Sequence, residues 1–138
     1  MAQTTNQKTS QDTIMNSVAQ RFAEAFNAHD VNAILSFMTN DCIFMAWTGP
    51  DADGEKFVGK EAVKKAFEDV FNTFPDAHWG NVTYFVAGNR TVTEWLFTGT
   101  KADGSKVAVT GCDLCTFRNG KIAIKNSYRK YRPAIPKK

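Results

Sequence analysis

Two carboxylates in the second half of the chain, Glu94 and Asp113, have the residue type and spacing that most clearly predict chemistry. Both lie in stretches typical of strands, and the Asp103-Gly104 dipeptide between them is typical of a tight hairpin. A symmetric hairpin centred on this dipeptide places Glu94 opposite Asp113. Because burial and like charge both oppose ionisation, at least one of the two then has a proton to exchange near neutral pH. We therefore predict that Asp113, assisted by Glu94, acts as an acid or base.

The next hairpin signal, Asn119-Gly120, surrounds Asp113 with neutral hydrogen-bonding groups. It places Asn126 opposite Asp113, and Tyr128 opposite Gly111. We expect this mostly apolar sheet face to lie beneath helices and to form a pocket. The other residues predicted to line the pocket are Phe22, Trp47, Phe67, Leu96 and Cys115.

Two features of this arrangement stay open. One alternative is that Glu94 points outward after a bulge, because a bulge reverses the side-chain direction along a strand. Another is that Glu94 forms a structural ion pair with an arginine. The arginines available for that pair are Arg90, Arg118 and Arg129. The opposite sheet face, which bears Trp95 and Phe97, mixes aromatic and polar residues as a dimer surface does.

His78 is a candidate second proton carrier, because it stands at the predicted entry to the sheet. The alternative is a structural histidine, and His29 is expected to be a residue of a linker between helices. We expect no metal, because the two histidines are far apart in the sequence and Cys112 and Cys115 point to opposite faces of a strand. No glycine-rich phosphate loop is present, and no cofactor is expected.

The elements that must position these residues follow from the hydrophobic periodicity. Helical spacing predicts a first helix that ends near Ala28, a short second helix capped by Asp30, and a third helix that ends before Pro75. A glycine- and aspartate-rich loop over residues 48–54 is expected at the rim of the pocket. The predicted strands are Cys42–Trp47, Val82–Val86, Thr91–Thr98, Lys106–Phe117 and Lys121–Tyr131. Helices followed by a meander of antiparallel strands predict an α+β fold.

The composition is that of one globular domain. The 138 residues are 43% hydrophobic and include eleven Phe, without an apolar run that could span a membrane. We expect a disordered polar leader over residues 1–11, a single domain over residues 12–132 and a basic tail over residues 133–138. Without a visible secretion signal, the predicted location is cytoplasmic. The net charge of +3 is too small to predict nucleic-acid binding.

Four short stretches also carry a family likeness. They are Phe26-Asn-Ala-His-Asp30, Phe74-Pro-Asp76, Phe97-Thr-Gly-Thr100 and Gly111-Cys-Asp-Leu-Cys-Thr-Phe-Arg-Asn-Gly-Lys-Ile122. In this order and spacing they resemble SnoaL-like polyketide cyclases and other nuclear transport factor 2-like proteins. The resemblance implies a cone of three helices against a strongly curved, mostly antiparallel sheet with an interior cavity. It also implies a homodimer through the sheet, which we place on the face bearing Trp95 and Phe97.

The resemblance assigns the key position to Asp113. In SnoaL-like cyclases the matching Asp is the acid or base of an intramolecular aldol closure, and in ketosteroid isomerases it is protonated and donates to an oxyanion. At the positions where the isomerase has its oxyanion-binding Tyr and its proton-shuttling Asp, this chain has Phe22 and Ala46 instead. Steroid isomerisation is therefore not expected. The hypothesis is a cofactor-free cyclase, isomerase or hydrolase in which Asp113 acts on a small hydrophobic or carbonyl-containing molecule. The alternative is a non-catalytic ligand-binding or protein-interaction module.

Overall fold

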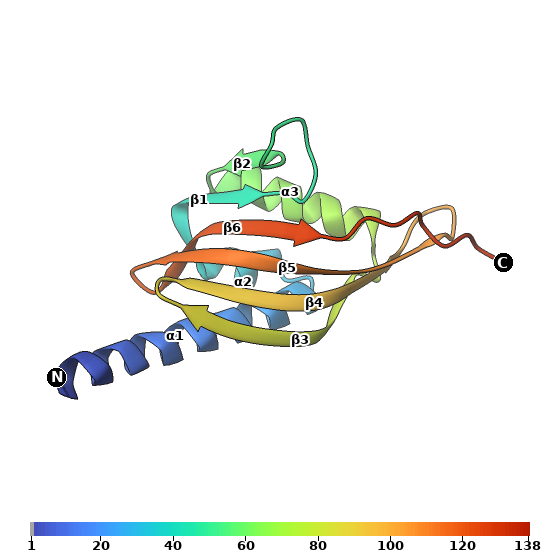
Figure 1. Cartoon of the computed structure of the whole chain (residues 1–138). Coiled ribbons are helices and arrows are strands. Elements are labelled where there is room, and N and C mark those ends of the chain that lie inside the picture. Colours follow the sequence, from blue (N-terminus) through green and yellow to red (C-terminus); the bar gives the residue numbers. More distant parts are fainter. Residues whose placement is uncertain (1) are drawn as a thin grey trace.

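The computed structural model describes residues 2–138, with side chains from Ser10 onward. Three helices precede or interrupt a sheet whose strand order is β2-β1-β6-β5-β4-β3 (Figure 1). The helices are α1 (Ala2–Asn27), α2 (Val31–Ser36) and α3 (Lys60–Thr73). The strands are β1 (Met38–Met45), β2 (Lys56–Val58), β3 (His78–Ala87), β4 (Arg90–Thr100), β5 (Lys106–Arg118) and β6 (Lys121–Arg129). The expected α+β class is confirmed.

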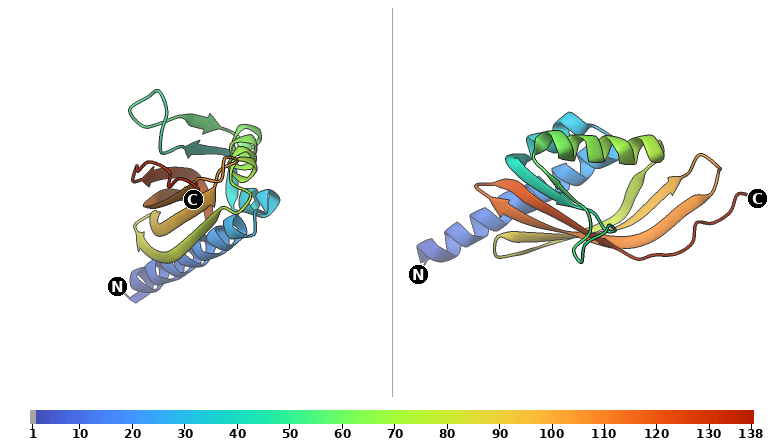
Figure 2. Two further views of the ribbon diagram at one scale, coloured as in Figure 1. Left: turned by 90° about the vertical axis from the view of Figure 1, so that its right-hand side faces the viewer. Right: turned by 90° about the horizontal axis from the view of Figure 1, so that it is seen from above.

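The helices gather on one side of the curved sheet and leave the other side uncovered (Figure 2). All neighbouring strands are antiparallel except β1 and β6, which run parallel. On β4 and β5 the odd-numbered side chains face the helices, because Trp95, Phe97, Val109 and Cys115 are all buried. This inward face carries the candidate site.

The helices largely follow the predicted signals. Asp30 caps α2, since its side chain accepts a hydrogen bond from the Ala33 amide at 3.1 Å. However, α1 begins at Ala2, so residues 2–11, expected as a disordered leader, belong to this helix, while Met1 lies outside the described residues. No helix in the described part of the chain combines the length and the apolar character needed to cross a membrane.

The end of α1 is fixed to the start of β3 by a side-chain clamp. Asn27 donates to the Trp79 carbonyl at 3.0 Å and accepts from the Trp79 amide at 2.8 Å. His29 contacts the carbonyl of Ala77 at 2.8 Å through Nε2 and stacks on Phe71, which gives it the structural role expected of it. These contacts hold α1 against the sheet beside the pocket.

The register between β4 and β5 corrects the first prediction. Asp113 pairs with Thr93, and Glu94 pairs with Cys112, one position away from the expected Glu94–Asp113 pair. The reason is the turn, because an odd number of residues, 101–105, separates the paired Thr100 and Lys106. Asp103 stabilises this turn by accepting hydrogen bonds from the amide and hydroxyl of Ser105. Glu94 therefore points away from the helices.

A bulge changes the second predicted register. Phe117 pairs with Ile122 next to the turn, but Thr116 pairs with Ile124, so the pairing shifts by one residue between Thr116 and Phe117. Beyond the bulge Asp113 faces Ser127, not Asn126. A bulge inserts one extra residue and reverses which side chains point inward.

The ends of the sheet also differ from expectation. The short strand β2 was not predicted, and it pairs with the end of β1 across the loop of residues 48–54. The chain after β6 is not simply a free basic tail, because the amide and carbonyl of Ile135 bond the carbonyl and amide of Lys106, each at 2.8 Å. The tail therefore binds the base of the β4–β5 turn.

Candidate active site

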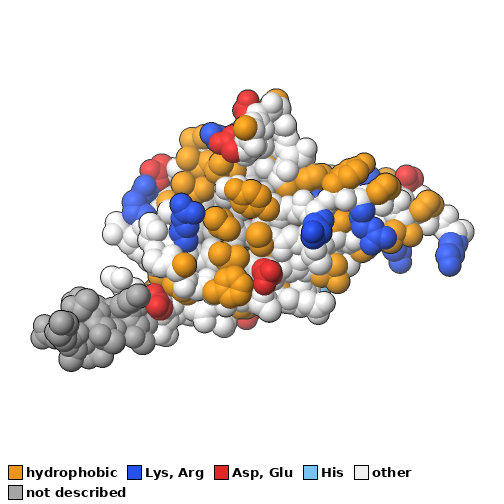
Figure 3. Space-filling view, viewed as in Figure 1, with side chains coloured by type: hydrophobic (Ala, Val, Ile, Leu, Met, Phe, Trp, Pro, Cys, Tyr) orange, Lys and Arg blue, Asp and Glu red, His pale blue; other side chains and the backbone are white. Residues whose placement is uncertain are grey.

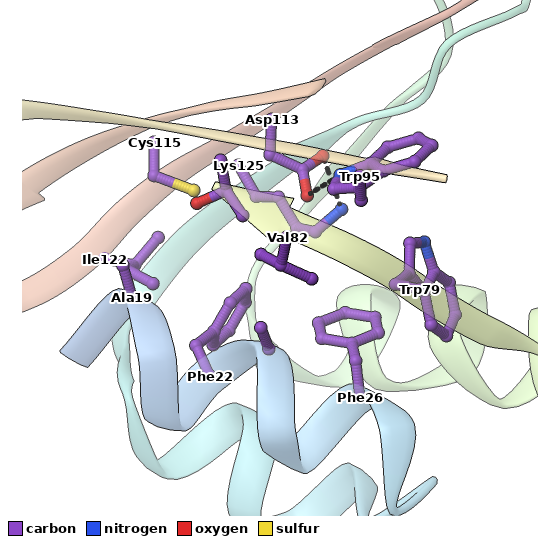
Figure 4. A pocket seen from close by; sticks show the side chains of 12 residues that line it. Ala19, Phe22, Phe26, Trp79, Val82, Trp95, Asp113, Cys115, Ile122 and Lys125 are labelled. Atoms are coloured by element: carbon purple, nitrogen blue, oxygen red, sulfur yellow. Dashed lines mark hydrogen bonds and ion pairs between the residues drawn. The ribbon is translucent and has the colours of Figure 1, made fainter. Parts of the chain in front are cut away.

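Asp113 lies buried on the inward face of β5, where both of its carboxylate oxygens accept hydrogen bonds. The indole nitrogen of Trp95 donates to Oδ2 at 3.0 Å, and the Ser127 hydroxyl donates to Oδ1 at 2.6 Å. Lys125 Nζ forms an ion pair with Oδ1 at 3.1 Å (Figure 4). The same nitrogen donates to Ser127 Oγ at 2.8 Å. Asp113, Lys125 and Ser127 thus form one closed polar network with Trp95.

Lys125 connects this network to aromatic side chains of the helices and β1. Its ammonium nitrogen lies 5.1 Å from the ring centre of Phe26, 4.8 Å from Phe44 and 5.9 Å from Phe67. A cation over aromatic faces is attracted by their negative centres, most strongly where water is excluded. The Lys125 ammonium group has three N–H donors, and Asp113 and Ser127 each accept one hydrogen bond from it. The third N–H remains available for another acceptor.

Two cavities meet at Lys125. The smaller, of about 30 Å³, lies between Asp113 on the sheet and Phe22 and Phe26 on α1 (Figure 4) and has room for one or two water molecules. The larger, of about 230 Å³, has Lys125, Ser127 and Arg129 of β6 on its wall. Its aromatic lining comprises Phe26, Phe44, Trp47, Phe67, Phe74, Trp79, Trp95 and Phe97. We call this larger cavity the aromatic pocket.

Gly111 makes room for the wall of the aromatic pocket. A Cβ atom at this position would lie 2.6 Å from Cη2 of Trp95 and 2.7 Å from Cβ of Arg129, and it would also meet the Tyr128 carbonyl. Real Cβ atoms essentially never approach that closely. The absence of a side chain therefore allows Trp95 and Arg129 to pack side by side over β5.

Residues 19–124 match the SnoaL-like domain family. The chain belongs to this SnoaL-like family. The match spans most of the domain, from α1 to β6, and includes Asp113. No curated protein matches the sequence.

Solved structures support the nuclear transport factor 2-like fold of this SnoaL-like protein. A proposed polyketide cyclase from Xanthomonas campestris is 20% identical, with a TM-score of 0.77 over 88% of this chain and 93% of the other. A nuclear transport factor 2-like protein of unknown function from Mesorhizobium loti is 26% identical, with a TM-score of 0.71 over 87% and 93%. A proposed isomerase from Bacillus subtilis is 13% identical, with a TM-score of 0.74 over 87% and 88%.

Several predicted residues of the SnoaL-like protein line its cavities. Phe22 and Cys115 line the smaller cavity together with Asp113, and Trp47 and Phe67 line the aromatic pocket. Burial raises the pKa of the Cys115 thiol to about 12, which favours the protonated thiol near neutral pH.

Other residues predicted for the pocket lie instead on the outward face of the sheet. Glu94, Leu96 and Tyr128 line an open hollow on the outward face, where Glu94 accepts a hydrogen bond from Thr83 at 3.0 Å. Asn126 donates to the Tyr128 hydroxyl at 3.0 Å on the same face. The alternative in which Glu94 points outward is therefore correct, although the odd-length turn rather than a bulge is the cause.

His78 is also displaced from the site. It is exposed at the start of β3, pairs with Thr98 and lines none of the cavities described above. Its ring lies over Gly80, on the outward side of the strand. The neighbouring Trp79 points inward instead and lines both cavities.

The site contains polar residues that the sequence analysis did not select, namely Lys125, Ser127 and Arg129. These residues occupy alternate positions along β6, so their side chains point to the same face of the strand. The register predicted without the bulge places that face on the outward side of the sheet, whereas the bulge turns it inward. Among the described residues, no group of three or more His, Cys, Asp or Glu side chains could hold a metal ion.

Proposed function

We propose that this SnoaL-like protein binds a small organic molecule in the aromatic pocket and acts on it as a cofactor-independent acid–base catalyst of the cyclase or isomerase type. The observation that carries this proposal is the buried Asp113–Lys125 ion pair at the junction of the two cavities. Replacing a buried ion pair with apolar residues is often neutral or stabilising, so stability alone does not account for such a pair. Charged groups buried in a cleft are candidates for chemistry.

The geometry favours an enolising carbonyl compound as substrate. The unused N–H of Lys125 can donate to the carbonyl oxygen, where negative charge develops as the adjacent C–H bond breaks. Ser127 lines the aromatic pocket and donates to Asp113, so its oxygen can accept the substrate proton as its own proton passes to Asp113 Oδ1. The C–H electron pair becomes the enolate, and reversing the transfer returns a proton to carbon.

The first test measures enolisation directly. We expect the protein to accelerate exchange of the α-hydrogens of 2-tetralone in D₂O, followed by proton NMR. Lys125→Met and Ser127→Ala remove the oxyanion donor and the proton carrier, and loss of an oxyanion donor costs about 100-fold or more in rate. The matched control is Glu94→Gln on the outward face, which is expected to exchange at the wild-type rate.

Two results would contradict the catalytic proposal. One is wild-type exchange no faster than in buffer, and the other is full acceleration in both Lys125→Met and Ser127→Ala. Thermal unfolding of each variant establishes that the assay temperature lies below its unfolding transition.

A second candidate is ligand binding without chemistry, and one observation favours it. Trp95, Ser127 and Lys125 already satisfy both oxygens of Asp113, which is what a purely structural carboxylate requires. In that case a molecule that copurifies in the aromatic pocket leaves the denatured protein chemically unchanged, and mass spectrometry before and after incubation distinguishes the two functions.

We also propose that the protein forms a homodimer, but not through the face that bears Trp95 and Phe97. Both residues are buried beneath the helices, at 7% and 3% exposure, which corrects the predicted surface. The uncovered face of the sheet displays hydrophobic side chains (Figure 3), and Phe85 and Tyr128 are more than half exposed.

Sedimentation equilibrium tests this proposal. The measured mass of the wild-type protein is expected to be twice that of one chain, and Tyr128→Asp is expected to associate more weakly. A measured wild-type mass equal to that of one chain contradicts the proposal.

A further inference from the structure

Arg129 places a positive charge in the wall of the aromatic pocket. Its guanidinium carbon lies 3.9 Å from the ring centre of Trp47 and 5.4 Å from that of Phe97. Stacking on aromatic rings uses the faces of the guanidinium group, whereas its N–H donors point outward in the plane. Stacking on the rings therefore orients the Arg129 side chain but gives its N–H donors no hydrogen-bond acceptor.

No acceptor among the described residues completes this arrangement. Nε is buried without a hydrogen-bond partner, and Arg129 takes part in none of the ion pairs within the described part of the chain. Burial alone lowers the pKa of the Arg129 guanidinium below its ordinary value, because no carboxylate offsets the loss of hydration. A half-buried cation normally has an anionic or hydrogen-bonding partner.

The other charges of the aromatic pocket do not supply that partner. Lys125 is the second cation of its lining, and the carboxylate of Asp113 neutralises it. Ser127 is already hydrogen bonded to both of these residues. The lining therefore has one uncompensated positive charge, which lies at Arg129.

We infer that the ligand of the aromatic pocket is an organic carboxylate, with an apolar or aromatic body among the ring side chains and its carboxylate on Arg129. This inference rests on the proposed small-molecule function of the same pocket. A planar carboxylate matches the in-plane donors of a guanidinium group, and one unpaired cation balances one negative charge. A carbonyl elsewhere on the ligand would then face Lys125, farther along the same strand.

The experiment compares two probes that differ in charge but hardly in shape, 2-naphthoate and 2-naphthamide, by isothermal titration calorimetry at neutral pH. We expect wild-type protein to bind the carboxylate about 10- to 100-fold more tightly than the amide, which is the range for hydrogen bonds to charged groups. Arg129→Gln is expected to abolish this preference, because it weakens binding of the carboxylate far more than binding of the amide. Continued binding of the amide by the variant shows that its pocket is intact.

Two further variants separate the site from general surface charge. Arg132→Gln removes an exposed arginine three residues away, whose guanidinium donates to the Ala108 carbonyl, and it is expected to keep the full preference. Arg129→Lys keeps the positive charge but loses the planar guanidinium group with its paired N–H donors. Its preference for the carboxylate over the amide is expected to lie between those of wild type and Arg129→Gln.

The possible failures are distinguishable. Equal affinity of wild type for the two probes, or equal loss of the preference in Arg132→Gln and Arg129→Gln, overturns the carboxylate site and leaves the aromatic pocket a small-molecule site. Failure of wild type to bind either probe at millimolar concentration overturns both the carboxylate site and the assignment of the pocket.

Discussion

Replacing Asp113 with Asn is expected to lower the free energy of unfolding by about 3–5 kcal/mol, as happens when one partner of a buried ion pair is removed. The substitution preserves the size of the side chain and an oxygen that can accept from Trp95. It leaves the ammonium group of Lys125, whose side chain is 9% exposed, without its counter-charge among three phenylalanine rings. The cost therefore comes from the uncompensated charge and not from a cavity.

Urea unfolding of a double-mutant cycle measures this cost. We expect Asp113→Asn combined with Lys125→Met to be more stable than Asp113→Asn alone, because the second change removes the stranded charge. The matched control is Asp41→Asn, which breaks the exposed ion pair with Arg118 and is expected to change stability little. Additive effects of the two buried substitutions would show that Asp113 and Lys125 do not depend on each other.

Replacing Phe67 with Ala is expected to cost about 3–5 kcal/mol of stability, the range for truncation of a buried aromatic side chain. Phe67 is 1% exposed, and its ring centre lies 4.9 Å from that of Phe26 and 5.0 Å from that of Phe44. It also flanks the ammonium group of Lys125. Its removal joins new space to the aromatic pocket, so the variant is expected to accept bulkier ligands.

Thermal and urea unfolding check the stability of this variant, and Tyr131→Ala supplies the control. Tyr131 is also aromatic, but it is 79% exposed beyond the end of β6, so a much smaller loss is expected. Similar losses for the two variants would contradict the assignment of Phe67 to the core. A crystal structure of Phe67→Ala with a larger aromatic carboxylate would show whether the added space is used.

The elements of this fold were largely predictable because their signals are local. Asp30 caps α2 as its capping chemistry predicts, and the Gly88-Asn89 dipeptide, which is typical of a tight hairpin, forms a two-residue turn between the paired Ala87 and Arg90. A two-residue turn leaves only one register for the residues beside it. The family resemblance carried by the Asp113 stretch also agrees with the matched family and with the fold.

The partners of Asp113 were not predictable because they depend on the number of residues in one turn and on one bulge. A dipeptide such as Asp103-Gly104 marks where a turn lies but does not state its length. Side chains alternate with a period of two, so one extra residue exchanges the two faces of a strand. Glu94 and Asn126 were therefore assigned inward, while Lys125 and Ser127 were assigned outward.

The alternation of inward and outward side chains along β6 has an evolutionary consequence. The apolar wall of the aromatic pocket comes from helices and several strands, whereas the polar groups that the ligand is proposed to meet, Lys125, Ser127 and Arg129, alternate on one strand. Point mutations at these three codons can change the charge and reactivity preferred by the pocket without rebuilding its walls. The intervening codons, Asn126 and Tyr128, specify the outward surface. The proposed substrate choice and the proposed self-association can therefore diverge independently among descendants of this gene, although residues for both alternate within fifteen nucleotides.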